Sequence, residues 1–127
     1  MKKIISTKKA PSAIGPYNQA TTYEKLVFTS GQIPLVCESM EIVEGGIKEQ
    51  SQLVMDHLKA VLEEAGSSVD NILKTTCYLS DMDNFASFNE VYATYFTSED
   101  APARATVAVK TLPKNVLVEV DAISFKN

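Results

Sequence analysis

This sequence has few of the residues from which disulfide frameworks and metal centres are built. Its 127 residues include two cysteines, Cys37 and Cys77, which stand far apart and form no CxxC pair. It has one histidine, His57, which we expect to be a surface or interface side chain rather than a metal ligand or a triad member. A disulfide scaffold and a structural zinc site therefore find no support, and a reducing cytoplasm fits best.

Long apolar runs and basic clusters are also missing. No window approaches the roughly 18 apolar residues that a bilayer requires, and the lysines at positions 2 and 3 are not followed by the apolar run of a signal peptide. Lys and Arg total 12 against 16 Asp and Glu, which gives a net charge of −4. Because nucleic-acid affinity comes largely from many cationic contacts, we expect a soluble cytoplasmic protein with neither a nucleic-acid nor a membrane partner.

The patterns that are present fit one folded domain. Apolar residues make up 45% of the chain and charged residues 22%, the usual globular mixture, and no linker or repeat divides residues 1–127. Alternating polarity predicts strands, and apolar spacings of three and four predict helices. In chain order we predict a short strand near Ile4, strands over 17–22 and 25–30, a helix over 47–65, a strand over 73–80, a second helix capped by Asp83 or Asn84, and strands over 104–110 and 116–125.

This order, β-β-β-α-β-α-β-β, predicts an α+β two-layer domain. Two helices cannot cover both faces of a sheet of five or six strands, so we expect both helices on one face. The last strand has an apolar row suited to packing beneath helices, which sends Glu119 and Asp121 to the opposite, bare face. In the strand before it, we interpret the odd-numbered residues of 105–109 as the apolar row. This places Arg104 and Thr106 on the bare face beside Glu119.

A sheet face that mixes an arginine and two carboxylates with apolar side chains is too apolar for solvent and too polar for a monomer core. Burial against further copies of the chain resolves this conflict. Two interpretations of Arg104 stay open: it binds an anionic ligand at the subunit boundary, or it pairs with Asp121 or Glu119 in a structural interface. Asn89, inside the apolar stripe of the second helix, either bonds neighbouring backbone or reaches a ligand.

Several short motifs stand in a fixed order along the chain: Ala13-Ile14-Gly15-Pro16-Tyr17, Thr29-Ser30-Gly31-Gln32-Ile33-Pro34, Pro102-Ala103-Arg104-Ala105-Thr106, Leu112-Pro113 and Val118-Glu119-Val120. Together they resemble the RidA (YjgF) family essentially from end to end. The resemblance implies a chorismate-mutase-like fold with a mixed sheet and a homotrimer with three ligand clefts between subunits. It also implies hydrolysis of 2-imino acids and their enamine tautomers to 2-keto acids and ammonia, without a cofactor or a metal.

The same resemblance assigns roles to individual residues. Arg104 would clamp the substrate carboxylate, and Glu119 would position the attacking water. The residues that would line the cleft are Tyr17, Ser30, Gly31, Asn89 and Thr106. Many relatives have a cysteine where this chain has Thr106, which puts thiol-dependent regulation in doubt but not imine hydrolysis. The alternatives are a non-catalytic trimer that binds a keto acid or related metabolite in the same cleft and a ribonuclease, which the net charge of −4 disfavours.

Overall fold

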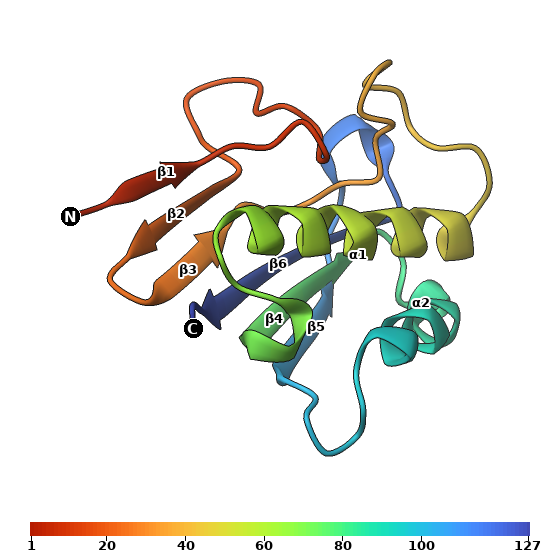
Figure 1. Ribbon diagram of the computed structural model, residues 1–127. Helices are drawn as coiled ribbons and strands as arrows, with labels where there is room; N and C mark the ends of the chain where they lie inside the picture. Colours follow the sequence, from red (N-terminus) through yellow and green to blue (C-terminus); the bar gives the residue numbers. More distant parts are fainter.

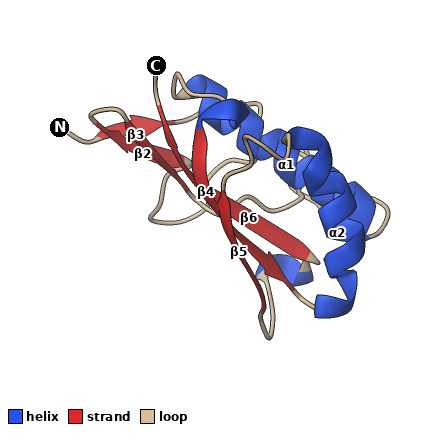
Figure 2. Cartoon of the chain, turned by 90° about the horizontal axis from the view of Figure 1, so that it is seen from below, coloured by secondary structure: helices blue, strands red, loops and turns tan.

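The computed structural model describes residues 1–127 as a six-stranded sheet with both α-helices on one face (Figures 1 and 2). In sequence order the elements are β1 (Lys3–Ile5), β2 (Ala20–Tyr23), β3 (Leu26–Thr29), α1 (Ile47–Glu64), β4 (Ile72–Leu79), α2 (Phe85–Tyr92), β5 (Ala103–Ala108) and β6 (Val118–Phe125). Across the sheet the strand order is β1-β2-β3-β6-β4-β5. Only β4 and β5 pair in parallel, and the other neighbours are antiparallel, so the mixed two-layer α+β fold is confirmed.

The long helix α1 follows the predicted range. The Gly46 N–H before it donates to the Glu49 carboxylate at 2.8 Å, and Gly66 beyond its end adopts a left-handed φ of 83°. The apolar side chains of its inner face, among them Leu58 and Leu62, are fully buried over the sheet. Neither helix has the length and apolarity needed to cross a membrane.

The second helix, α2, is short and aromatic. A 3₁₀ turn over Met82–Asn84 leads into it, and the Asp81 carboxylate caps that turn by accepting the Asp83 N–H at 2.8 Å. Asn84, one of the two predicted caps, does stand at the N-cap position of α2, but its side chain makes no capping hydrogen bond. Phe88 is fully buried, and the Tyr92 hydroxyl bonds the Thr75 hydroxyl of β4 at 2.8 Å. These contacts fix α2 beside the β4 end of the sheet.

The central strands separate a buried face from a bare one, as predicted. Cys77 of β4 lies opposite Val120 of β6 beneath the helices, and both are fully buried. Tyr78 lies opposite Glu119 on the other face, where no helix packs. Strict alternation over the predicted strand 73–80 would bury Leu73 in the same row as Cys77. Leu73 is instead 48% exposed, because a register shift between Ile72 and Lys74 gives Ile72 the core position.

Strand β5 faces the opposite way from our prediction. Its register places Arg104 opposite Thr75 and Thr106 opposite Cys77, so both side chains lie on the helix side of the sheet. The apolar residues of β5 point to the bare face instead, and Val107 there is 43% exposed. Both rows of this edge strand are weakly apolar, so polarity alone did not determine its orientation. Arg104 and Thr106 therefore do not share a face with Glu119.

Candidate functional site

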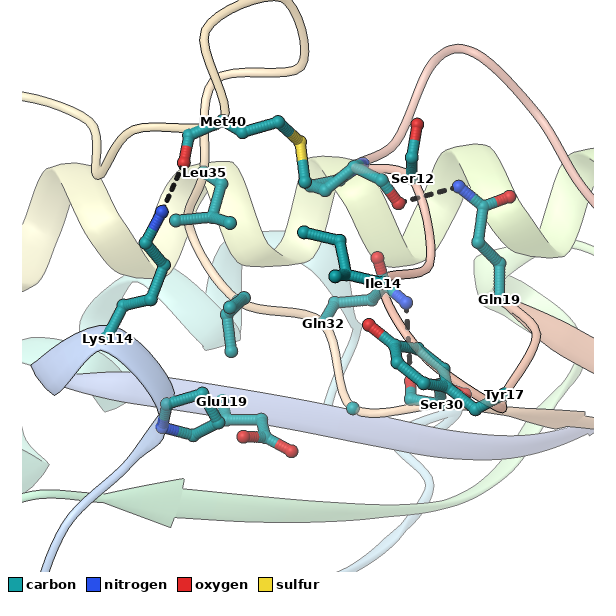
Figure 3. Close-up of a pocket in the computed structure, with 14 residues that line it drawn as sticks. Ser12, Ile14, Tyr17, Gln19, Ser30, Gln32, Leu35, Met40, Lys114 and Glu119 are labelled. Carbon is teal, nitrogen blue, oxygen red and sulfur yellow. Dashed lines mark hydrogen bonds between the residues drawn. The ribbon is translucent and has the colours of Figure 1, made fainter.

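A cleft of about 450 Å³ opens beside the start of β6, and its walls come from three loops (Figure 3). The N-terminal loop contributes Tyr17, the segment after β3 contributes Ser30 and Gly31, and β6 contributes Glu119. The segment after β3 returns to β6 through paired backbone hydrogen bonds between Gln32 and Val120, of 2.8 and 3.2 Å. This pairing brings four of the predicted site residues into one cavity.

Glu119 lies at the floor of the cleft, packed against the backbone of Gly31. A Cβ added to Gly31 would overlap the Glu119 carboxylate, so this approach requires a glycine. Burial raises the pKa of Glu119 above its usual value, and the nearby charge of Asp121 raises it further. The only salt bridge in the chain joins Lys48 and Glu90, so no cation neutralises the Glu119 carboxylate. It is a half-buried base that faces an open cavity.

Tyr17 and Ser30 stand at the rim on the same side of the cleft (Figure 3). Tyr17 is 49% exposed, so packing does not explain its position. The Ser30 hydroxyl donates to the backbone carbonyl of Asn18, which fixes the two cleft-lining segments together. Tyr17 and Ser30 therefore both line the cavity, and neither side chain is a charged nucleophile.

The walls are held by polar residues that the sequence did not reveal. Gln19, 4% exposed, accepts the Thr7 N–H at 2.6 Å and donates to the carbonyls of Thr7, Ala10 and Pro11 at 3.0, 3.2 and 2.8 Å. This amide fastens the N-terminal loop that forms one wall. A glutamine within the strand predicted over 17–22 carries no distinctive signal, so only the fold identifies its role.

Two further contacts hold the opposite wall. His57, predicted at the surface, is only 4% exposed, and its Nε2–H donates to the Leu35 carbonyl at 2.7 Å. The loop over 32–46 folds back across α1 and covers the ring, which the helix pattern alone could not indicate. The Lys114 ammonium donates to the Met40 carbonyl at 2.8 Å, and both residues have left-handed φ angles, 55° and 60°. Strained backbone thus concentrates at the cleft rim.

Arg104 occupies a second depression, between α2 and the start of β5. Its guanidinium lies 4.7 Å from the ring centroid of Tyr92 and 5.5 Å from that of Phe85, which are favourable cation–π distances. Its Nη1 donates to Asn89 Oδ1 at 2.7 Å. Asn89 therefore bonds a side chain rather than neighbouring backbone, and its contact with a ligand stays a prediction. The other donors of the stacked guanidinium have no hydrogen-bond partner within the chain.

Thr106 lies beside the buried Cys77 rather than in the cleft. Its hydroxyl is buried and has no hydrogen-bond partner within the chain. Burial raises the pKa of the neighbouring Cys77 thiol to about 11, so this thiol stays protonated and unreactive at neutral pH. The chain therefore has a thiol on the strand next to Thr106, but in a form without nucleophilic character.

One chain does not bring the two charged site residues together. Glu119 projects from the bare face of β6, whereas Arg104 lies on the helix side of β5, with β4 between the two strands. Within one chain Arg104 forms no ion pair with Glu119 or Asp121, so a pair across an interface between copies stays a prediction. No group of three or more His, Cys, Asp or Glu side chains is placed to hold a metal ion.

The chain matches one family model and is similar in sequence to several known proteins. The family model of endoribonuclease L-PSP matches residues 7–126. A RutC family protein of Pyrococcus abyssi is 50% identical over 125 residues, covering 98% of both chains. TdcF of Escherichia coli, provisionally named a reactive intermediate deaminase, is 43% identical over 129 residues, covering 100% of this chain and 99% of its own.

Two further comparisons concern ligands and naming. The crystal structure of E. coli TdcF with bound serine has a TM-score of 0.91 to this chain at 41% identity, covering 98% of this chain and 99% of that chain. AldR of Lactococcus lactis, provisionally named a regulator, is 46% identical over 122 residues, covering 96% of each chain. Relatives of similar identity thus carry names from two functional classes.

Proposed function

The chain belongs to the endoribonuclease L-PSP family, the RidA (YjgF) family, and on this basis we propose that it is an enamine/imine deaminase. Its substrates are 2-iminobutanoate and 2-iminopropanoate, the reactive products of amino-acid dehydratases, and its products are 2-keto acids and ammonia. The reaction needs no cofactor. The main support for the proposal is Glu119, a half-buried carboxylate that pairs with no cation and faces a cleft of about 450 Å³.

The complete site lies between two copies of the chain, in a homotrimer. Glu119 and Arg104 leave the sheet on opposite faces, so a small imino acid cannot touch both within one chain. Arg104 sits on the edge strand β5, from which it can extend into the cleft of a neighbouring copy. One copy then supplies Tyr17 and Glu119, and its neighbour supplies Arg104.

The bare sheet face supports this assembly. It exposes large apolar side chains that a monomer would leave in water, including Tyr23 at 56%, Leu26 at 41% and Phe28 at 41%. These residues lie on the same face as Glu119 because their strands pair with β6 in register. Burying such a patch is favourable by roughly 25 cal/mol per Å² of apolar surface. A closed ring of identical copies covers it without leaving a further face exposed.

The reaction needs little activation of the substrate by the protein, because an imine carbon is already electrophilic. The Arg104 guanidinium holds the substrate carboxylate through two parallel donors, which orients the C=N bond above the cleft floor. A water oxygen bonds to the imine carbon, its proton passes to Glu119, and the nitrogen takes a proton from solvent. The carbinolamine then loses its hydroxyl proton to solvent while the C–N bond breaks, and Glu119 returns its proton to the departing ammonia.

A non-catalytic ligand-binding role is the second candidate, favoured by the serine-bound structure of TdcF and by the name of AldR. The same Arg104 and cleft would hold a small carboxylate without turnover. Glu119→Gln separates the two candidates, because the amide keeps the size of the side chain but accepts no proton. Turnover should disappear in this variant under the first candidate, while carboxylate binding should persist under both.

The testing experiment generates 2-aminocrotonate with a dehydratase and follows release of the keto acid with and without the protein. Acceleration by the wild type that disappears in Arg104→Ala and in Glu119→Gln supports the deaminase. Lys59→Ala, which removes an exposed cation of α1 away from the cleft, is the matched control and should keep full acceleration. No acceleration by folded, oligomeric wild type rejects the deaminase and leaves the binding role, tested by calorimetry with 2-oxobutanoate.

A further inference from the structure

Asp121 and Tyr78 form a small titratable cluster next to Glu119 that the proposed reaction has not used. Tyr78 of β4 lies directly opposite Glu119 of β6, and Asp121 follows two residues later on the same bare face. The Tyr78 hydroxyl donates to Asp121 Oδ2 at 3.2 Å. Three oxygen-bearing side chains are thereby gathered on neighbouring strands, and of these Glu119 lines the cleft.

We propose that Asp121, held in place by Tyr78, is a positioning residue for Glu119 whose negative charge determines the pH range in which Glu119 exchanges protons with substrate. This inference rests on the proposed deaminase function and adds two residues to it. Same-face residues two apart on a strand are roughly 7 Å from one another, close enough for their charges to interact strongly in a partly buried setting. Asp121 therefore makes it harder for Glu119 to carry its own charge.

The electrostatic surroundings agree with this direction. Burial raises the pKa of Glu119 and the Asp121 charge raises it further, whereas the pKa of Asp121, itself raised by burial, is lowered by the Tyr78 hydroxyl. The hydroxyl thus offsets part of the effect of burial and favours the ionised form of Asp121, the form that raises the pKa of Glu119. A carboxylate that accepts and returns one proton in each turnover works best when its pKa is moved toward the working pH.

Several titratable side chains surround Glu119. Asp121 comes from its own strand, Tyr78 from β4, and Tyr17 and Lys114 from the loops of the cleft. The Lys114 ammonium points away toward the Met40 carbonyl, as Figure 3 shows. Lys74 acts on Asp121 by lowering its pKa, which also keeps that carboxylate ionised. Asp121 is thus the only charged group within the chain that raises the pKa of Glu119.

The test compares the pH dependence of kcat/KM in wild type, Asp121→Asn and Tyr78→Phe. If activity needs ionised Glu119, it falls as the pH drops through the pKa of Glu119. Asp121→Asn removes the neighbouring charge, so the acid limb should move to lower pH by about half a unit to one and a half units. Tyr78→Phe should produce a smaller shift in the same direction, because Asp121 is then protonated more easily.

Asp70→Asn is the matched control, since it removes one exposed carboxylate from the far side of the protein and should leave the limb unchanged. An Asp121→Asn limb that coincides with the wild-type limb overturns the proposal. A carboxyl-carbon NMR titration of Glu119 without substrate gives an independent reading that does not depend on turnover. If wild type shows no deaminase activity, the proposed function fails, and an unshifted Glu119 titration in Asp121→Asn overturns the coupling as well.

Discussion

The substitution Gly31→Ala should displace the Glu119 carboxylate with little effect on the stability of the fold. The φ angle of Gly31 lies outside the left-handed region, so alanine fits the backbone. Its Cβ would overlap the Glu119 carboxylate and lie 2.9 Å from Glu119 Cγ. Because the obstructed group is the end of a flexible side chain, it can turn away for about 1 kcal/mol, the cost of an off-rotamer side chain.

The catalytic effect of that small movement should be much larger. A displacement near 1 Å in a reacting group lowers an enzymatic rate by roughly 100-fold. We therefore expect kcat/KM for 2-aminocrotonate to fall about 100-fold, while the free energy of unfolding in urea changes by about 1 kcal/mol or less. Gly46→Ala is the matched control, because no atom lies within 4 Å of its added Cβ and its φ is also outside the left-handed region. Wild-type activity in Gly31→Ala would refute the placement of Glu119.

Three further substitutions test the environment of the site. Gln19→Leu leaves four backbone groups of the N-terminal loop without their hydrogen-bond partner and should lower the free energy of unfolding in urea by about 2 to 4 kcal/mol. A loss no larger than that caused by Gln52→Leu, at an exposed position, would contradict this. Thr106→Val removes a buried hydroxyl without a partner and should be neutral or stabilising by up to about 1 kcal/mol; a loss of stability would mean that a second copy supplies the missing partner. Burial lowers the pKa of His57 below its usual 6.5, so the unfolded chain takes up a proton that the folded chain resists. The free energy of unfolding should therefore fall as the pH drops below about 6.5, and His57→Gln should show less of this fall between pH 7 and 5. If the free energy of unfolding depends on pH equally in both proteins, His57 is exposed to water and the reasoning is wrong.

The elements with strong periodic patterns were predicted well because one face of each is buried. The helix over Ile47–Glu64 and the strand over Val118–Phe125 carry continuous apolar rows, and burial of those rows leaves one orientation open to each. The bare face with Glu119 and Asp121 followed directly from the β6 pattern. Four residues given cleft roles by family resemblance, Tyr17, Ser30, Gly31 and Glu119, do line one cavity.

The errors arose where local pattern does not determine tertiary contacts. Strand β5 is an edge strand with small residues on both faces, so its orientation is set by the stacking of Arg104 on Tyr92 rather than by polarity. Leu73 was misassigned because a register shift has no signature in the sequence. His57 is buried by a distant loop that folds over α1, a contact between residues 22 positions apart. Each case depends on a partner that only the assembled fold supplies.

The central claim is that each active site combines Glu119 of one copy with Arg104 of its neighbour. Arg104→Ala and Glu119→Gln should each be inactive alone, and the two are to be unfolded together in equal amounts and refolded as mixed trimers. With random mixing, about a quarter of the sites receive an intact Arg104 and an intact Glu119, so about a quarter of wild-type activity should return. Mixed trimers, verified by mass, that remain as inactive as the separate variants would contradict a site shared between copies.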